Sequence, residues 1–236
     1  MSQACIQLSN IEFYWANTQQ PLINIESLIL KKSEKLFIHG PSGCGKTTLL
    51  NLISGVLKPS RGEITVLGKN LFSQKQKSRD QYRADHMGII FQQFNLIPYL
   101  NVLENITLPC LFSWRRREML SIQKRSTMEE ALRLLAALGL KDKDIIFKNV
   151  TELSTGQQQR VAAARALIGS PEIIIADEPT SALDQDAKQG FLKLLFEEAM
   201  KSNSAILFVS HDLTLASLFD RSVSLNDFSK VKKHEH

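Results

Sequence analysis

The residues best suited to chemistry lie in the stretch HGPSGCGKTT, His39–Thr48. Within it, Gly40-x4-Gly45-Lys46-Thr47 fits the pattern G-x-x-x-x-G-K-[ST]. Glycines let the backbone curl until successive N–H groups point inward, and such a curl cradles phosphate oxygens. Lys46 would bring a positive charge to the β- and γ-phosphates, and the Thr47 hydroxyl can bind Mg²⁺. We therefore predict a nucleoside triphosphate site made by Gly40, Pro41, Ser42, Gly43, Cys44, Gly45, Lys46, Thr47 and Thr48.

Two elements must position this loop. The segment before it, KLFIHG, is a continuous apolar strand of the kind that is buried on both faces of a parallel sheet. The segment after it reads as a helix from Thr47 to about Ser54, with Gly55 and then Pro59 as its stop. This helix adds the positive end of its dipole to the cradle. The pattern alone leaves kinases, GTPases and motor ATPases open.

A second candidate site is the segment EIIIADEP, in which a fully apolar strand ends in Asp177 and Glu178. A carboxylate at the carboxyl end of a buried parallel strand can hold Mg²⁺ opposite Thr47. The adjacent Glu178 is then the natural general base for polarising an attacking water. The plainer interpretation is an ordinary acidic strand end, which the phosphate-binding loop in the same chain disfavours.

A third feature is the segment LSTGQQQRVAAARALIGSP, Leu153–Pro171. Ser154 followed three residues later by Gln157 is a capping-box pattern, and helical spacing continues to Ile168. The N–H groups at such a helix start are a second potential phosphate binder. Taken alone, a well-capped surface helix is the better interpretation.

The composition limits the class of protein. The chain has 236 residues, 43% of them apolar, which is enough for one large domain or two small ones. It has 29 Lys and Arg against 24 Asp and Glu, and the net charge of +5 is too small to indicate nucleic acid. No apolar run approaches the ~18–20 residues of a membrane span, and the start MSQACIQLSN lacks signal-peptide character. We therefore expect a soluble, cytoplasmic chain. The three cysteines have no metal-ligand spacing and form no even-numbered framework, so we expect reduced thiols.

Strand and helix patterns follow a definite order. Residues 3–30 read as short strands with a turn at Ala16–Pro21, and GEITVLG and MGIIFQ are further strands. A polar, basic segment, SQKQKSRDQYRADH, separates the last two. From about Asn101 to Leu140 the pattern is helical, and strand patterns return at EIIIAD and AILFVS. This order predicts an α/β core with an inserted helical piece.

The sequence resembles the ATP-binding cassette (ABC) ATPases over nearly its whole length. GPSGCGKT resembles the family's Walker A loop, IFQQFNLIP its Q-loop region, LSTGQQQR its signature, IIIADEP its Walker B strand, SALD its D-loop and LFVSHD its switch-histidine segment. The resemblance implies an ATPase with an α/β P-loop core built on a parallel sheet, an N-terminal antiparallel β subdomain and an inserted α-helical subdomain. It also implies that residues 1–236 are a single nucleotide-binding domain, with the helical subdomain at about 95–165.

The resemblance gives the signature segment a role. In this family two cassettes pair head to tail, and the signature helix of one points at the γ-phosphate held by the other. By analogy, Ser154 and Gly156 would act across a dimer, and Gln157 would hold the signature turn in place. Asp184 of SALD would link the two halves of the dimer. Capping the helix that runs toward Met200 is a second, compatible role for Asp184.

Two catalytic roles follow from the same resemblance. Gln92, at the expected end of the GIIFQ strand, would contact Mg²⁺ and the attacking water, and Gln93 is the competing candidate. His211 would contact the γ-phosphate and orient the water activated by Glu178. The full set of expected catalytic residues is thus Lys46, Gln92, Glu178 and His211, and the expected ligands of Mg²⁺ are Thr47, Gln92 and Asp177.

An aromatic residue near the start of the chain should stack on adenine. In NIEFYWAN the family pattern places Trp15 there, where tyrosine is commoner. Strand alternation puts Phe13 and Trp15 on one face and Tyr14 on the other. We expect Phe13 to be the core residue and Trp15 the stacking residue.

The signature departs from the family at one position. Thr155 stands where glycine is usual between the signature serine and glycine. A β-branched residue restricts the backbone and adds bulk beside the expected γ-phosphate. Because Ser154 and Gly156 keep their hydrogen-bond donors, we expect working catalysis at a reduced rate.

The resemblance also implies partners. The expected state is a homodimer closed over ATP and Mg²⁺, and pairing with a different cassette is the alternative. We expect it to work with a separate membrane permease at the cytoplasmic face of a bacterial inner membrane, without nucleic acid. The segments FQQFNLIP and NVLENITLP most resemble those of cassettes from lipoprotein-releasing, macrolide-exporting and cell-division systems. Phe94 and Leu96 are expected on the face that receives the permease, and helical-subdomain core is the plainer interpretation.

Two other classes compete with a transporter-type subunit. Soluble ABC proteins of DNA repair or translation usually carry long coiled coils or two cassettes in one chain, and neither pattern is present. A P-loop small-molecule kinase would lack the signature helix. The motifs do not encode what is moved or in which direction, because that specificity lies in the permease.

Overall fold

The computed structural model describes residues 3–16, 18–181 and 183–228. They divide into two compact units. The first combines the residues up to Arg83 with those from Leu207 onward, and the second is Ala84–Ile206. Strand β8 (Ala205–Ser210) contains the second boundary between them.

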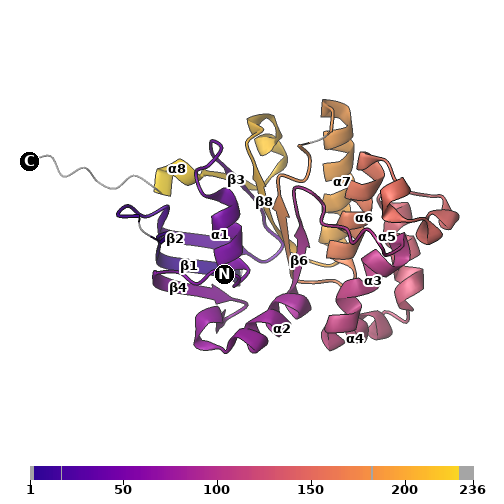
Figure 1. Cartoon of the computed structure of the whole chain (residues 1–236), viewed down its shortest axis with the longest axis horizontal. Helices are drawn as coiled ribbons and strands as arrows, with labels where there is room; N and C mark the ends of the chain where they lie inside the picture. Colours follow the sequence, from indigo (N-terminus) through magenta and orange to yellow (C-terminus); the bar gives the residue numbers. More distant parts are fainter. Residues whose placement is uncertain (1–2, 17, 182, 229–236) are drawn as a thin grey trace, which may run out of the picture. The chain divides into compact units, whose positions relative to one another are not determined.

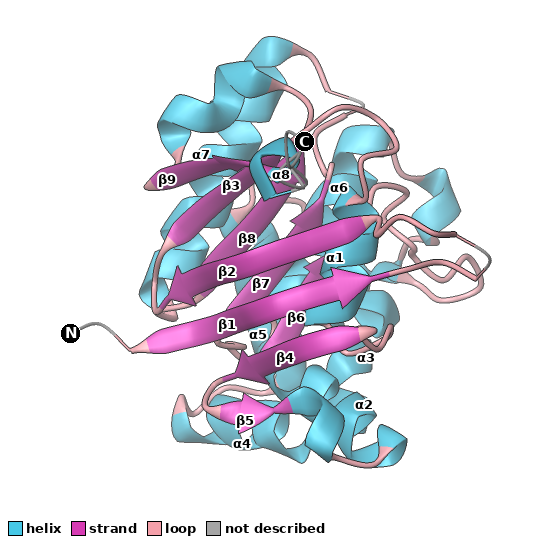
Figure 2. Ribbon diagram, turned by 90° about the vertical axis from the view of Figure 1, so that its left-hand side faces the viewer, coloured by secondary structure: helices cyan, strands magenta, loops and turns pink. Residues whose placement is uncertain are grey.

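The first unit contains a four-stranded antiparallel sheet with the order β2-β1-β4-β5 (Figure 2). Buried and more exposed residues roughly alternate along its two long strands, which is the period-two pattern of a sheet with one covered face. The strands of this sheet are β1 (Ala4–Phe13), β2 (Ile23–Lys31), β4 (Arg61–Val66) and β5 (Lys69–Asn70).

A parallel pair of strands leads into the phosphate-binding loop. β3 (Lys35–His39) is buried through its centre and pairs in parallel with β9 (Arg221–Ser224). The ring of Phe37 stacks on Phe208 of β8 and packs against Phe219, with centroid distances of 6.0 and 5.1 Å. This aromatic cluster keeps the strand before the loop in the core. The helical elements of this unit are α1 (Lys46–Ile53), η1 (Leu71–Ser73), most of α2 (Gln76–His86), η4 (Leu213–Leu218) and α8 (Leu225–Phe228).

The second unit contains the parallel pair β6 (Met87–Ile90) and β7 (Ile173–Asp177). Every residue of β7 is buried, as expected for a strand covered on both faces. In the register of this pair, Ile90 lies opposite Ala176. The carboxyl ends of the two strands therefore lie at the same edge of the pair.

Helices form most of the remainder of the second unit (Figure 1). Helix α6 (Thr155–Leu167) passes close to β6 because Gly88 has no side chain: a Cβ there would lie 2.1 Å from the carbonyl oxygen of Ala166. The other helical elements are α3 (Val102–Phe112), α4 (Trp114–Ile122), α5 (Thr127–Ala137), η2 (Lys143–Phe147), η3 (Val150–Glu152) and α7 (Gln185–Lys201).

The predicted α/β fold is confirmed, with an antiparallel sheet, parallel strands and helices between them in the chain. One segment gained structure that the sequence patterns did not predict. The polar, basic segment before β6 contains α2, which has a single buried residue, Tyr82. The Tyr82 hydroxyl donates to the carbonyl oxygen of Val66 at 3.0 Å, so one aromatic anchor replaces the apolar stripe of an ordinary surface helix. Among the described residues, no helix combines the length and apolar character needed to cross a bilayer.

Candidate functional site

The phosphate-binding loop connects β3 to α1 in the first unit. Gly43 and Gly45 have φ angles of 79° and 98°, a region that glycine enters without steric cost. Gly45 is also the N-cap residue of α1, where no side chain caps the helix and no acidic residue lies in the first turn. Backbone N–H groups at an uncapped helix start are the usual donors to a bound anion.

Lys46 folds back along the loop. Its side chain is only 7% exposed, and Nζ donates to the carbonyl oxygens of Gly40 and Pro41 at 2.9 and 3.0 Å. A Cβ on Gly40 would lie 2.7 Å from Sγ of Cys44, so the cysteine side chain fills the space beside this glycine. The next residue, Thr47, is exposed at the start of α1. The loop therefore combines a backbone cradle, a cation and a hydroxyl.

Trp15 and His211 also belong to the first unit. Trp15 follows β1 and is 49% exposed, and its ring meets the buried Phe13 ring edge-on with a centroid distance of 5.1 Å. This agrees with Phe13 as the core residue, and stacking of Trp15 on adenine stays a prediction. His211 is exposed directly after β8, and the next residue, Asp212, caps η4 by accepting from the N–H of Thr214 at 3.2 Å.

The acidic pair lies at the carboxyl end of β7 in the second unit. Asp177 is the last residue of the strand and is 9% exposed. Glu178 follows with a φ of 44°, in the left-handed region. Such a conformation costs a residue with a side chain about 1–3 kcal/mol, and strain of this kind concentrates at active sites. The strain fits Glu178 better as a reactive group than as an ordinary strand end.

Gln92 and Gln93 both lie in an exposed turn, because β6 ends at Ile90. Position at the strand end therefore does not separate them, and the choice of Gln92 stays a prediction. Since Ile90 lies opposite Ala176, this turn and Asp177 follow the same edge of the β6–β7 pair. The carboxyl edge of parallel strands is where α/β proteins bind ligands.

Phe94 is not on the surface. It is 7% exposed, which corrects the expectation that it faces a permease. The segment that follows is folded against α3, where the fully buried Asn105 accepts from the Ile97 N–H and donates to its carbonyl oxygen. Leu96 is half-buried, and Tyr99, at 80% exposed, is the accessible aromatic residue of this segment.

The predicted capping box is present at the start of α6. Ser154 Oγ accepts from the Gln157 N–H at 3.3 Å, and Gln157 Oε1 accepts from the Ser154 N–H at 2.9 Å. Thr155 is the exposed first residue of the helix. A Cβ on the next residue, Gly156, would meet nothing within 4 Å. Within the described structure of this chain, nothing requires glycine at position 156.

Asp184 caps the following helix. Its Oδ1 accepts from the Ala187 N–H at 2.8 Å at the start of α7. The helix-capping role is therefore confirmed, and the link between the halves of a dimer stays a prediction. Ala182 of the SALD segment lies outside the described residues.

The candidate ligands for Mg²⁺ are oxygen donors: the Thr47 hydroxyl, the Gln92 amide and the Asp177 carboxylate. The described part of the chain contains no group of three His, Cys, Asp or Glu residues suited to holding a metal ion by itself. A few hard oxygen ligands combined with substrate phosphates are what Mg²⁺ prefers. The residues present fit Mg²⁺ bound together with a nucleotide.

Two arginine networks have no counterpart in the motifs: that of the buried Arg165 and that of the half-buried Arg133. Arg165 of α6 donates to the carbonyl oxygens of Phe94 and Asn95, next to the Gln92 turn. The available signal was an arginine within the alanine-rich, buried face of a helix. Arg133 of α5 contacts Glu130 at 2.8 Å and Glu198 of α7 at 2.7 Å.

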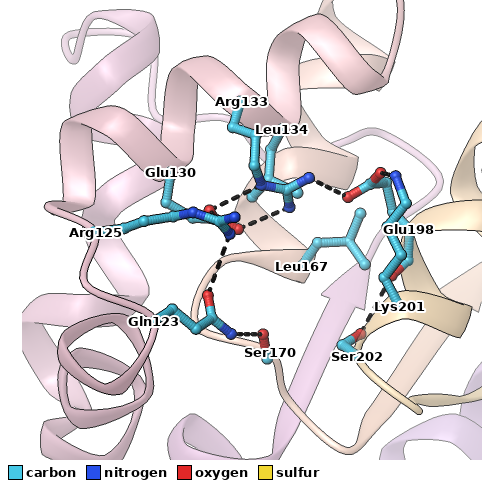
Figure 3. Close-up of a pocket in the computed structure, with 10 residues that line it drawn as sticks. All are labelled: Gln123, Arg125, Glu130, Arg133, Leu134, Leu167, Ser170, Glu198, Lys201 and Ser202. Carbon is cyan, nitrogen blue, oxygen red and sulfur yellow. Dashed lines mark hydrogen bonds and ion pairs between the residues drawn. The ribbon is translucent and has the colours of Figure 1, made fainter.

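Arg133, Glu130 and Glu198 line a pocket of about 300 Å³ in the second unit (Figure 3). Both carboxylates are only 3% exposed, and their charges are met by Arg125, Arg133 and Lys201. None of the predicted site residues lines this pocket. The network joins α5 to α7, and its charged groups form ion pairs with one another.

Comparison with known proteins defines the class to which this fold and site belong. A family model described as "ABC transporter" matches residues 23–181. The chain belongs to the ABC transporter family, as an ATP-binding cassette with ATPase activity. The resemblance inferred from the motifs is confirmed.

Individual relatives are similar over almost the whole chain. The lipoprotein-releasing system ATP-binding protein LolD of Hydrogenovibrio crunogenus is 37% identical over 229 residues, which are 96% of each protein. The dimeric structure of the cassette MJ0796 of Methanocaldococcus jannaschii matches with a TM-score of 0.80 and 33% identity over 93% of each chain. A post-hydrolysis structure of MJ0796, bound to ADP and Pi, matches with a TM-score of 0.78 and 32% identity over 93% of each chain.

Proposed function

We propose that this ABC ATPase is the ATP-hydrolysing subunit of a membrane complex in which a separate permease performs transport or mechanical work. The observation that carries the proposal is the start of α1. Gly45 begins the helix without a side-chain cap, and the Lys46 ammonium lies beside the same loop. A helix start with that backbone and that charge suits a polyphosphate.

The chain would act as a single nucleotide-binding domain covering residues 1–236. The helical subdomain would occupy about 95–165. The order of elements supports this assignment, because α3, α4 and α5 follow one another between β6 and the signature helix α6. The signature and the turn after β6 then belong to the same unit.

The phosphates would be held by the N–H groups of the loop and by Lys46. Thr47, Gln92 and Asp177 would hold Mg²⁺, which neutralises charge that develops on the phosphates. The hydroxyl and the carboxylate contribute hard oxygen ligands, and the amide contributes a neutral one. Trp15, half exposed beside the buried Phe13, would cover the adenine ring.

Hydrolysis would begin at Glu178. Its carboxylate would accept a proton from water as the water oxygen attacks the γ-phosphorus, and the bond to the leaving ADP oxygen would break. His211, exposed at the end of β8, would orient this water and contact the γ-phosphate. Most of the barrier would be lowered by positioning and charge stabilisation rather than by covalent chemistry.

A second copy of the chain would complete the site. Ser154 and Gly156 would donate to the γ-phosphate across a head-to-tail homodimer, with Gln157 holding their turn. The open space around Gly156 supports this, because its lack of a side chain has no use within the described structure. The dimeric structure of MJ0796 supports the same state.

The membrane partner is inferred from the relatives. LolD is named for a lipoprotein-releasing system, and the macrolide export protein MacB of Haemophilus ducreyi combines ATP-binding and permease functions in its name. This chain covers 32% of MacB, at 34% identity. The chain would therefore supply the cassette and bind a permease peripherally, at the cytoplasmic face of the membrane.

The decisive test uses Glu178→Gln, which should bind ATP and stall hydrolysis. The variant is added to native membranes with ATP, recovered, and analysed for co-purifying proteins by mass spectrometry. The proposal expects a multi-span protein that is absent with ADP and absent from a Lys46→Ala control. An ATP-dependent dimer without any membrane partner would instead indicate a soluble ABC ATPase with a cytosolic role.

A further inference from the structure

The turn after Gln92 has a strained backbone. Phe94 and Asn95 have φ angles of 58° and 48°, two successive left-handed residues, neither of which is glycine. Such a pair is uncommon, and a bulky aromatic residue is especially unfavourable there. Within the turn, the N–H groups of Phe94 and Asn95 donate to the carbonyl oxygens of Phe91 and Gln93 at 2.9 and 2.6 Å. A strained conformation persists only when its surroundings hold it.

Arg165 of α6 supplies a hold from outside the turn. Its Nη1 donates to the Asn95 carbonyl oxygen at 2.7 Å, and its Nη2 donates to the Phe94 carbonyl oxygen. The planar guanidinium can bind two neighbouring acceptors at once, whereas the ammonium of lysine acts as a point charge. The two strained residues therefore share one clamp.

The arginine is not explained by core packing. Arg165 is 9% exposed, and burial lowers its pKa to about 10. Its hydrogen-bond partners among the described residues are those two backbone carbonyl groups, without a carboxylate. Burying a cation without a counter-ion is unfavourable, and methionine would fill a similar space without that cost. The clamp itself is the remaining reason for an arginine.

The same helix carries the signature residues. Helix α6 runs unbroken from Thr155 to Leu167, with Ser154 as its cap. Arg165 lies ten positions after Thr155 in this helix, a distance of about 15 Å along a rigid element. A shift of the signature end therefore reaches the Arg165 clamp and the turn that it holds.

We propose that Arg165 is a positioning residue: it holds the turn that presents Gln92 and joins that turn to the signature helix. This inference rests on the proposed role of Gln92 toward Mg²⁺ and water. Arg165 acts through Gln92, because its guanidinium binds the backbone of the turn that carries this glutamine. Asn105 holds the later part of the same segment, at Ile97 and Leu100, so the two clamps divide the loop between them.

Arg116 provides a matched control. It is 1% exposed, burial lowers its pKa to about 10 as well, and its guanidinium also binds backbone carbonyl groups. The guanidinium donates to the carbonyl oxygens of Ala84 and Met87 at the start of β6, and to those of Ala166 and Ile168 at the end of α6. Loss of Arg116 therefore removes a clamp of the same chemistry at the start of β6 and the C-terminal end of α6, and leaves the contacts of Arg165 with the turn after β6 in place.

The test compares the wild-type full chain with Arg165→Met, Arg165→Lys and Arg116→Lys. Amide hydrogen exchange is measured by mass spectrometry, alongside ATP affinity, kcat and the Mg²⁺ concentration for half-maximal rate. In Arg165→Met, exchange across residues 91–96 should rise about tenfold or more, since two hydrogen bonds from a charged group are lost. ATP affinity should stay within about twofold while kcat falls about tenfold and the Mg²⁺ requirement rises. Arg165→Lys should recover part of each change.

Arg116→Lys should raise exchange near residues 84–87 and 166–168 and leave the Mg²⁺ requirement unchanged. Unaltered exchange at 91–96 in Arg165→Met would overturn the inference, as would an equal effect of Arg116→Lys on the Mg²⁺ requirement. If Arg165→Met does not fold, Arg165→Lys decides by the same readouts. A wild-type chain without ATPase activity would contradict the proposed function, and the exchange experiment would still decide whether Arg165 holds the turn.

Discussion

The ammonium of Lys46 lies 2.9 Å from the carbonyl oxygen of Gly40 and so binds the first residue of its own phosphate loop. The backbone of the loop therefore positions the lysine beside the phosphate cradle. Its hydrogen bonds to backbone carbonyl groups can be exchanged for stronger ones to phosphate. This relationship makes Lys46 the most direct test of the site.

Lys46→Ala should abolish turnover. Loss of one preorganised donor to the transition state typically lowers kcat by about 10²–10³-fold. Phosphate release measures the rate. Lys69→Ala is the matched control, because Lys69 is exposed and its ammonium lies over the Tyr82 ring, 5.1 Å from the ring centroid. A Lys46→Ala rate within a few-fold of wild type would show that the site is wrongly assigned.

Gly156→Ala should weaken dimerisation without lowering the stability of the fold. A Cβ at Gly156 meets nothing within 4 Å, and the same is true of Gly190 within α7. Alanine favours a helix over glycine by up to about 1 kcal/mol, so neither substitution should lower the thermal midpoint. Gly156→Ala should weaken ATP-dependent dimerisation, measured by light scattering, and Gly190→Ala should not. Equal dimerisation of both variants would contradict action of the signature across a dimer.

Tyr99→Glu should release the permease without affecting the cassette. Tyr99 is 80% exposed, so a charge there meets water. In the ATP-trapped Glu178→Gln background, co-purification with the membrane partner should be lost while ATP affinity is retained. Phe94→Glu should instead unfold the cassette, because burial of a carboxylate without a partner costs several kcal/mol.

A control for this experiment is Phe147→Glu, since Phe147 is another exposed aromatic residue of the second unit, at 67%. It should bind the membrane partner normally. If Phe147→Glu and Tyr99→Glu release the partner equally, a general effect of exposed aromatic residues explains the loss and Tyr99 is not a specific contact.

The free energy of unfolding should fall at acid pH because Glu198 becomes protonated. Burial raises the pKa of Glu198, but hydrogen bonds from Lys201 and Arg133 outweigh it, so this pKa lies below its ordinary value of 4.5. A carboxyl group with a lowered folded-state pKa stabilises the fold above the ordinary pKa, and this contribution is lost as pH falls through the lowered pKa. Urea unfolding at a series of pH values from neutral downward should show the loss.

Glu198→Gln should flatten the pH dependence below pH 4.5, the ordinary value, because its amide does not titrate. The adjacent Glu197 is exposed, and Glu197→Gln should keep the wild-type pH dependence. A Glu198→Gln profile with the wild-type slope would remove Glu198 from this account.

Local features of the site could be predicted from the sequence. The capping box at Ser154 and Gln157 joins residues three positions apart, so its pattern carries its own geometry. The phosphate loop and β7 are similar cases, because the glycine spacing and the continuous apolar run each determine a local conformation. The α/β class followed from the order of such segments.

Features held by distant residues could not be predicted. The left-handed backbone at Asn95 is fixed by Arg165, which lies 70 positions away in the chain. The burial of Phe94 depends on the same turn, so its apolar character alone did not separate a core residue, which it is, from one that faces a permease. Helix α2 could not be predicted because it has no apolar stripe. Tyr82, whose hydroxyl donates a hydrogen bond to the carbonyl oxygen of Val66 in β4, anchors it instead.

The uncapped start of α1 has a thermodynamic consequence. A Ser or Asp at the N-cap would stabilise the helix by about 1 kcal/mol, and Gly45 supplies no side chain to do so. A phosphate bound there takes the place of the missing cap. Ligand that binds only the native state adds RT ln(1 + [L]/Kd) to its stability, about 2.7 kcal/mol at 100 times Kd. ATP, which this cassette hydrolyses, thus also contributes to the stability of its native state.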